Sequence, residues 1–208
     1  MLHGDLSIPT GAQGLVLFAH GSGSSRHSPR NQYVARTLRE GRLGTLLFDL
    51  LTAEEEQAEA YTRHLRFNIP FLAERLMGAT QWALDCTTTR DLSVGYFGSS
   101  TGAAAAIVAA ARLRETISAV VSRGGRPDLA AEALETITAP TLLIVGGNDT
   151  VVRRLNEDAL ERLRCEKALR LVPNATHLFE ETGALEIVAS QAVEWLVHHL
   201  HPLTDRHP

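Results

Sequence analysis

The sequence predicts an α/β fold in which helices cover both faces of a mostly parallel sheet. Six short apolar runs, typical of strands that are buried on both faces, alternate along the chain with helical patterns. These runs are 15–19, 46–48, 92–97, 119–121, 142–145 and 169–172. Strands that alternate with helices form βα units, which place the strands parallel. The length of 208 residues favours a single domain over 1–208, because no repeat, linker or change of composition divides the chain.

Local signals define the individual elements in order. A short strand over 6–8 extends the N-terminal edge of the sheet. The first helix follows Ser28, which is an N-cap residue with proline after it, and ends at Gly41. Another helix follows Asn68, with apolar residues at steps of three and four. The last helix, over 185–200, has one apolar and one polar face.

Charge and composition exclude several classes of protein. The chain has 20 Lys and Arg against 24 Asp and Glu, and this net charge of −4 argues against nucleic-acid binding. Cys86 and Cys165 lie far apart, so we expect no disulfide, no zinc pair and a cytoplasmic location. No metal site and no cofactor are expected, since cysteine and carboxylate neighbours are missing around the C-terminal histidines His198, His199, His201 and His207.

The uncharged segment 92–111 has the length of a membrane-spanning helix. Its middle is rich in glycine and its second half is mostly alanine, which is too weakly apolar to drive insertion. It predicts a strand, a sharp turn and a helix instead. The N-terminus has no basic stretch followed by an apolar one, so we expect neither a signal peptide nor a membrane partner.

The sharp turn carries the first candidate for chemistry. Gly98-Ser99-Ser100-Thr101-Gly102 matches G-x-S-x-G between a strand and a helix, the context in which a nucleophilic serine is exposed on a strained turn. Glycines two positions before and after the serine leave room for the neighbouring strand and helix. A plain turn with Ser100 as helix N-cap is the alternative. The flanking strand and helix favour Ser100 as a nucleophile.

A serine nucleophile needs a base, and two later strand ends supply the partners. Asp149 follows the run at 142–145, and His177 follows the run at 169–172. The order Ser, Asp, His at successive strand ends is that of α/β-hydrolases. Each residue also has a structural interpretation, Asp149 as a helix cap and His177 as a loop histidine. Asp128, after the preceding strand, is the alternative acid.

The loop after the first long strand, His20 to Ser25, is expected to help form an oxyanion hole. A tetrahedral intermediate develops a negative oxygen that fixed backbone N–H groups can stabilise. We expect one donor at Thr101, directly after the nucleophile. The second is assigned to Ser22, with Gly21 or Gly23 as alternatives. The loop lacks the lysine of a phosphate-binding loop, and His20 is interpreted as a structural residue beneath it.

Taken together, these motifs resemble the small α/β-hydrolases of the dienelactone hydrolase-like family. The resemblance includes the subgroup that occurs alone or fused to phosphoribosyltransferase domains. The matching segments span nearly the whole chain: 20–25, 49–52, 98–102, 146–149 and 175–177.

The resemblance implies a three-layer α/β-hydrolase fold with Ser100 as nucleophile, His177 as general base and Asp149 as its orienting acid. Dienelactone hydrolases proper have cysteine at the nucleophile position, where this chain has serine. The dienelactone substrate is therefore not carried over.

The sequence thus predicts a serine hydrolase that cleaves small carboxylic esters or thioesters through an acyl-enzyme. Thioesterase or perhydrolase acyl transfer by the same triad is one alternative. The other is a non-catalytic interaction module that keeps the hydrolase scaffold. Formation of a homodimer is left open.

Two features bear on the substrate. Arg123 follows the fourth long strand and is a candidate to hold a substrate carboxylate or phosphate, or else to pair with Asp128 or another acid. Thr52 has capping-box spacing to Glu55 and opens an acidic helix, interpreted as solvated, with a partial lid as the alternative. The connection 122–140 has room for one helix only, which predicts no cap domain and an open site.

Overall fold

The structure is a computed structural model that describes residues 1–62 and 64–201. Seven strands form one sheet in the order β1-β3-β2-β4-β5-β6-β7. Their bounds are β1 (Gly4–Ser7), β2 (Gly14–Ala19), β3 (Leu43–Phe48), β4 (Ser93–Ser99), β5 (Ile117–Arg123), β6 (Thr141–Gly146) and β7 (Lys167–Val172). Strands β2 to β7 are parallel and β1 pairs antiparallel with β3 at the edge. The predicted mostly parallel sheet is confirmed.

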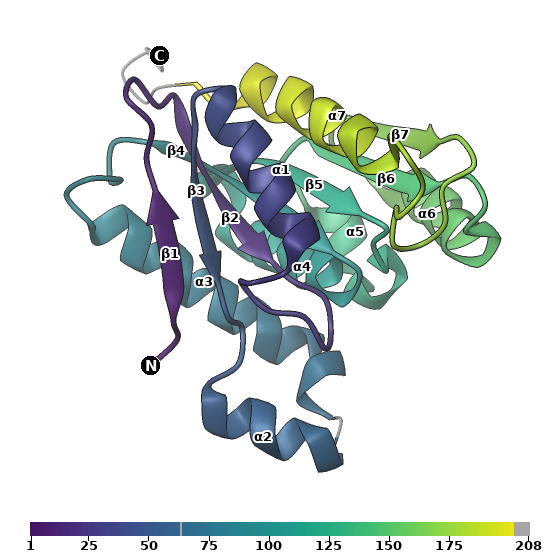
Figure 1. Ribbon diagram of the computed structural model, residues 1–208, viewed down its shortest axis with the longest axis horizontal. Helices are drawn as coiled ribbons and strands as arrows, with labels where there is room; N and C mark the ends of the chain where they lie inside the picture. The colour runs from purple at the N-terminus through teal and green to yellow at the C-terminus, as the bar shows by residue number, and fades with distance from the viewer. Residues whose placement is uncertain (63, 202–208) are drawn as a thin grey trace.

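Helices cover both faces of the sheet, as Figure 1 shows. One face carries α1 (Pro29–Glu40) and α7 (Ala184–His199). The other carries α3 (Ile69–Asp85), α4 (Thr101–Leu113), α5 (Ala133–Thr136) and α6 (Thr150–Arg162). Helix α2 (Ala53–Thr62) and the short 3₁₀ turn η1 (Leu65–Phe67) lie apart from these layers, beyond the carboxyl ends of the strands.

The two apolar layers follow from the alternation of side chains along each strand. In β2, Val16 and Phe18 pack toward α1 and α7, whereas Leu15 and Leu17 pack toward α3 and α4. All four side chains are at most 2% exposed. Because both faces are covered, β2 is a continuous apolar run, as the sequence predicts.

Three elements differ from the sequence prediction. Strand β7 lies at the sheet edge and is only partly buried, because no further strand or helix covers its outer side. The N-terminal strand covers Gly4–Ser7 rather than 6–8, since Pro9 has no N–H to continue a ladder. The connection between β5 and β6 contains a 3₁₀ turn, Pro127–Ala130, and the four-residue α5 in place of one regular helix.

No additional domain covers the sheet within the described residues, in agreement with the minimal α/β-hydrolase fold expected. None of the described helices is long and apolar enough to cross a bilayer. The predicted strand, turn and helix over 92–111 are present as β4 and α4. Of the C-terminal histidines, His207 lies outside the described residues. That residues 1–208 form a single domain stays a prediction.

Candidate active site

A cavity of about 900 Å³ opens at the carboxyl ends of the parallel strands. Its wall includes the loop after β2, the turn after β4, the end of β5 and the loop after β7. Ser22, Ser100, Arg123 and His177 all line it. The fold therefore brings four of the predicted site residues to one cavity. Ligands of open parallel sheets bind at this edge.

Ser100 has the backbone strain expected of a nucleophile on a sharp turn. Its φ is 50° and its ψ is −122°, a conformation that residues with a Cβ rarely adopt. A Cβ at Gly98 would lie 2.5 Å from Ala103 Cα, and one at Gly102 would lie 2.1 Å from the Ala19 carbonyl oxygen. Both glycines are therefore required sterically. Ser100 is at the N-cap position of α4 but its side chain makes no capping hydrogen bond, so the simple N-cap interpretation fails.

Two backbone hydrogen bonds hold the strained residue in place. The Ser100 N–H donates to the Arg123 carbonyl oxygen at 3.3 Å, and the Arg126 N–H donates to the Ser100 carbonyl oxygen at 3.1 Å. The loop after β5 thus engages both backbone polar groups of Ser100. Strain of this kind persists where the surroundings over-determine it.

His177 and Asp149 meet as the sequence predicts. The distance from His177 Nδ1 to Asp149 Oδ2 is 2.7 Å. Asp149 Oδ1 also accepts a hydrogen bond from the Val152 N–H at 3.4 Å, so the residue caps α6 as well. An ionised carboxylate accepts only, so His177 Nδ1 carries the proton and Nε2 is left as the basic nitrogen.

Asp128, the alternative acid, has a different partner. Its two oxygens accept from Arg126 Nε at 2.8 Å and Arg126 Nη2 at 2.7 Å. This two-point pairing raises the pKa of Arg126 through its hydrogen bond with Asp128. The structure therefore pairs Asp149, and not Asp128, with His177.

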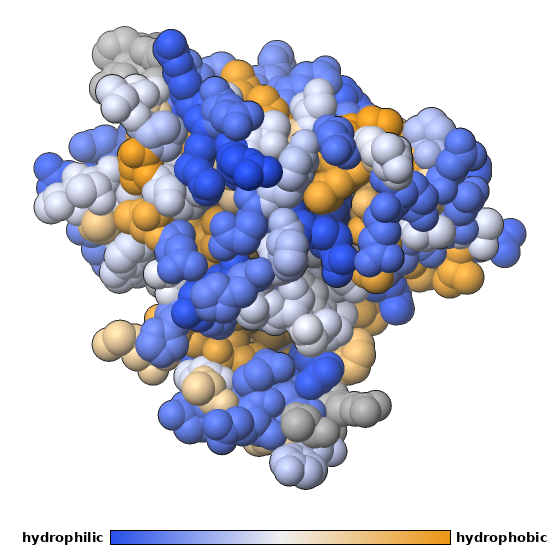
Figure 2. Space-filling model, viewed as in Figure 1, coloured by the Kyte–Doolittle hydropathy of each residue, from blue (hydrophilic) through white to orange (hydrophobic). Residues whose placement is uncertain are grey.

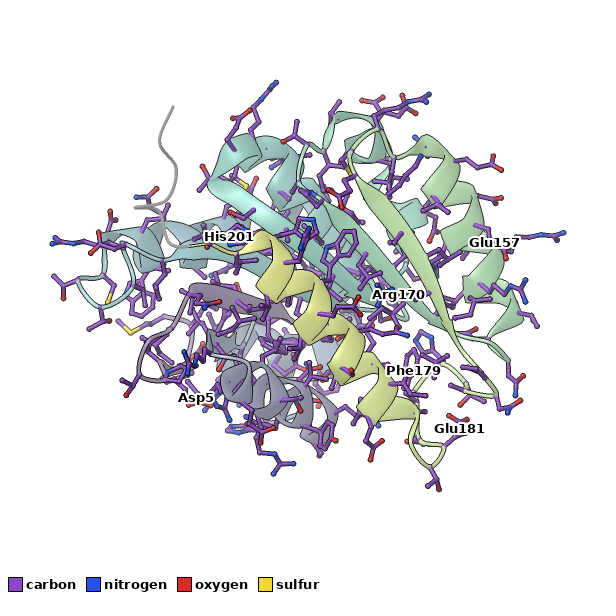
Figure 3. The ribbon with its side chains drawn as sticks, turned by 90° about the horizontal axis from the view of Figure 1, so that it is seen from above. Asp5, Glu157, Arg170, Phe179, Glu181 and His201 are labelled. Atoms are coloured by element: carbon purple, nitrogen blue, oxygen red, sulfur yellow. The ribbon has the colours of Figure 1, made fainter. Side chains whose placement is uncertain are left out.

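The loop that carries His177 is shaped by residues on either side of it. Glu181 Oε1 accepts from the Thr176 hydroxyl at 2.6 Å and from the Thr176 N–H at 3.0 Å. Phe179 is buried at a positive φ of 55°, although bulky residues avoid this region. A Cβ at Gly124 would lie 3.3 Å from the Phe179 ring and 3.5 Å from His177 Cε1. Figure 3 labels Phe179 and Glu181 in this loop.

His20 fixes the loop predicted to form the oxyanion hole. Its Nε2 accepts from the Leu50 N–H at 3.0 Å, so its Nδ1 carries a proton and donates to the Gly21 carbonyl oxygen at 2.9 Å. Burial lowers the pKa of His20 and favours this neutral form. His20 is thus a structural residue, as the sequence indicates. A trans peptide points its N–H opposite to its C=O, so His20 also orients the Ser22 N–H.

The Ser22 N–H donates to Thr101 Oγ1 at 3.1 Å. The two residues predicted as oxyanion donors are therefore in direct contact. A Cβ at Gly21 would lie 3.1 Å from Ser100 Cβ, so the missing side chain lets this loop approach Ser100. The assignment of Ser22 as the second donor stays a prediction.

The cavity also contains arginines whose arrangement the sequence does not reveal. Arg123 is only 9% exposed, and its pKa is lowered to about 10. Burial is the main cause, and the nearby positive charge of Arg30 lowers the pKa further. Arg26 pairs with Asp49, and Arg30 pairs with Glu180 at 3.3 Å. Arg30 lies at the start of a helix and belongs to no other sequence motif, so the sequence did not mark it as a residue of the cavity. The alternative role of Arg123, a pairing with Asp128, is not realised, because Asp128 is bound by Arg126.

Helix α2 borders the cavity through its first turn. Thr52 and Glu56 line the cavity, and Thr52 and Glu55 form the predicted capping box. At the other end, the buried Glu59 accepts from Arg66 Nε at 3.0 Å. Figure 2 shows a mostly hydrophilic surface over α2, at the bottom of the view. The helix is solvated on its outer side and covers one edge of the site.

Comparison with known proteins places these features in a family. Residues 46–198 match the dienelactone hydrolase family. The crystal structure of a dienelactone hydrolase from Anabaena variabilis superposes with a TM-score of 0.95 at 61% identity, over 96% of this chain and 93% of that one. Est1E from Butyrivibrio proteoclasticus superposes with a TM-score of 0.79 at 17% identity, over 95% and 94% of the two chains. The latter likeness shows the fold alone.

A longer relative comes from Mycobacterium tuberculosis, and its name assigns it provisionally to the phosphoribosyl transferases. It is 54% identical over 197 residues, which is 95% of this chain and 44% of that protein. The present chain therefore spans less than half the length of this relative.

Proposed function

Because the chain belongs to the dienelactone hydrolase family, we propose that it is a serine hydrolase that cleaves small carboxylic esters or thioesters. One observation carries the proposal. Ser100, held at a φ of 50° on a tight turn, opens on the same cavity as His177, whose Nδ1 is bound by Asp149 at 2.7 Å. An exposed hydroxyl, a base and an acid that orients the base are the components of nucleophilic acyl transfer.

In the first step Ser100 Oγ attacks the carbonyl carbon of the ester. His177 Nε2 takes the hydroxyl proton while the new C–O bond forms, and Asp149 stabilises the resulting imidazolium. The carbonyl oxygen becomes negative and is held by the N–H groups of Thr101 and Ser22. The Ser22 N–H becomes available when the Thr101 hydroxyl turns away from it. The intermediate then expels the alcohol or thiol, which takes the proton from His177.

In the second step a water molecule attacks the acyl-enzyme. His177 accepts the proton of the water, the acid product forms, and the proton is returned to Ser100 as the C–O bond to the enzyme breaks. Every proton transfer uses the same nitrogen, so the neutral form of His177 is the active one.

The cavity geometry favours small acyl groups. Within the described residues, the cavity is bordered by short loops and by α2, with no cap domain above it. A long acyl chain would lie in solvent and gain little from burial. We therefore expect acetyl and butyryl esters to react with higher kcat/KM than long-chain esters, in a panel of 4-nitrophenyl esters.

Labelling by a fluorophosphonate tests the activated serine directly. The wild-type protein should be labelled, and Ser100→Ala should not be labelled although it remains folded. Hydrolysis of 4-nitrophenyl acetate should disappear in the same variant. An unlabelled wild-type protein would instead indicate a non-catalytic module, and rates with thioesters and with peroxide as acceptor distinguish the other acyl transfers.

A matched pair of variants tests the acid. Asp149→Asn should lower kcat by about 10⁴, because an amide holds the wrong tautomer of His177. Asparagine is also a good helix cap, so α6 should keep its stability. Asp128→Asn is the control and should retain most activity, since Asp128 binds Arg126. Equal losses in both variants would refute the assignment.

A further inference from the structure

Arg123 is a buried cation without a partner. Its Nη1 atom is enclosed by protein and has no hydrogen-bond acceptor. No described acidic residue forms an ion pair with it, and the charged group that acts on it is another arginine, Arg30. Enclosing an unpaired charge is unfavourable because it loses its hydration without gaining a partner. Because this guanidinium also lines the cavity, an anion bound in the cavity could neutralise it.

The neighbouring arginines show how unusual this is. Arg26 is neutralised by Asp49, and Arg126 by Asp128. Arg30 pairs with Glu180, whose side chain is 65% exposed and held by this single contact of 3.3 Å. A pair as exposed as that contributes little, so Arg30 can exchange Glu180 for another anion at small cost.

The sheet register places Arg123 beside the nucleophile. Arg123 on β5 is paired with Ser99 on β4, so their backbones are about 4.8 Å apart. Residues in register on parallel strands point to the same face. Ser99 Oγ donates to Asn31 of α1, so Arg123 also extends toward the first turn of α1, where Arg30 lies. An anion held there lies in the same cavity as Ser100.

The same corner of the cavity is rich in donors suited to phosphate. Arg30 follows the N-terminus of the 12-residue helix α1, whose first turn contains no acidic residue. The positive end of a helix attracts anions. Ser24, Ser25 and Ser28 also line the cavity. Two guanidiniums, a helix N-terminus and several hydroxyls offer more donors than a carboxylate can accept, and a phosphate has three terminal oxygens to receive them.

We propose that Arg123 and Arg30 form a subsite for a phosphate group, so that the substrate is a small ester that also carries a phosphate. This deepens the proposed function and rests on it for the identity of the substrate. Without phosphate, Arg30 is paired with Glu180. Phosphate displaces Glu180 from Arg30 when the phosphate binds.

Calorimetric titration with inorganic phosphate tests the subsite without any reaction. At constant ionic strength, wild-type protein should bind phosphate more tightly than acetate. Arg123→Gln should weaken phosphate binding by about tenfold to a hundredfold, because a charge-assisted hydrogen bond is lost. Arg153→Gln, which removes a surface arginine paired with Glu157 on α6, is the matched control and should bind like wild type.

Two partly exposed variants cover the case in which Arg123→Gln does not fold. Arg30→Gln should weaken phosphate binding several-fold, whereas Glu180→Gln should strengthen it, because Arg30 is then free. These shifts have opposite signs, which a general loss of structure cannot produce. Equal shifts, no shift in a folded Arg123→Gln, or acetate binding as tight as phosphate would overturn the proposal.

The substrate is tested with two esters that differ only in the phosphate, butyrylglycerol phosphate and monobutyrin. Wild-type enzyme should prefer the phosphorylated ester in kcat/KM, and Arg123→Gln should lose this preference. Fluorophosphonate labelling separates the two proposals. Arginine-dependent phosphate binding in a protein that does not label refutes the hydrolase and leaves the subsite, whereas a labelled protein without phosphate binding refutes the subsite.

Discussion

Two walls of the cavity are stabilised by different kinds of contact, one by close backbone packing and the other by charged side chains. The elbow wall, residues 98–102 with Gly21, is defined by missing side chains, since its glycines allow backbone to touch backbone. The α2 wall, residues 52–62 and 64–67, is held by charged side chains such as Glu59, which is fully buried and binds Arg66. His20 lies between the two walls, because it binds Gly21 of the elbow wall and Leu50, two residues before the start of the α2 wall.

The difference predicts different sensitivities. Close backbone contacts leave no space for an added atom, so substitutions that enlarge a side chain in the elbow wall should destabilise the protein. No charged side chain takes part in these contacts. Loss of one partner from a buried ion pair is strongly destabilising, so substitutions that remove a charge should destabilise the α2 wall. Ser100 thus lies on the wall of close backbone contacts, whereas the α2 wall is held by side-chain contacts that can be broken singly.

The largest effect is expected from added volume in the elbow wall. In Gly102→Ala the new Cβ would lie 2.1 Å from the Ala19 carbonyl oxygen, so β2 and α4 must separate. We expect a loss of about 3 kcal/mol in the free energy of unfolding, measured by urea denaturation. Gly78→Ala is the control, because no atom lies within 4 Å of its Cβ on α3, and it should gain up to about 1 kcal/mol.

Loss of charge in the α2 wall should have the next largest effect. Glu59→Gln leaves Arg66 without its buried carboxylate and should destabilise the α2 wall by about 2 kcal/mol. Hydrogen exchange should show faster opening of α2 while the sheet keeps its protection. Glu74→Gln removes an exposed pair with Arg112 and should change little. A uniform loss of protection across the sheet would contradict a separately held wall.

Relief of backbone strain at Ser100 should have a smaller effect of opposite sign. Ser100→Gly removes the Cβ that disfavours a φ of 50° and should stabilise the protein by about 1 kcal/mol in urea denaturation, with loss of activity. Arg114, at the end of α4, also has a φ of 50°. Arg114→Gly should therefore give a similar gain and keep activity. If Arg114→Gly raised the free energy of unfolding and Ser100→Gly did not, the backbone at Ser100 would not be strained.

The smallest effect concerns His20, which lies between the two walls. Burial lowers the pKa of His20 below its unfolded value of about 6.5, so the unfolded state binds more protons than the folded state as the pH falls. Stability should therefore decrease from about pH 7.5 to pH 5.5, and His20→Gln should flatten this slope in urea denaturation. An unchanged slope would mean that His20 does not contribute.

The sequence predicted the candidate site because its signals are local. The glycines at 98 and 102 and the acid and histidine after later strands mark the carboxyl edge, and parallel strands bring that edge together. The distinction between Asp149 and Asp128 was weaker, since both follow strands. It depends on the tertiary structure, where Asp128 is bound by Arg126 and Asp149 reaches His177.

Edge effects were less predictable. The apolar run 169–172 in β7 was expected to be buried on both faces, yet Leu169 is only half-buried and Leu171 is exposed, because position in the sheet is a property of the whole fold. The broken helix between β5 and β6 has a local cause, Pro127, which starts a 3₁₀ turn.

The sequence by itself determined the fold class, the sharp turn at Ser100 and the order of the candidate triad, because hydrophobic periodicity and glycine placement act over short stretches of chain. Only the tertiary structure decided which acid meets His177 and which arginine remains without a partner. Both outcomes depend on distances between residues far apart in the chain. Arg123 and Arg30 belong to different elements, and only the fold brings both to the lining of one cavity, where their charges act on each other.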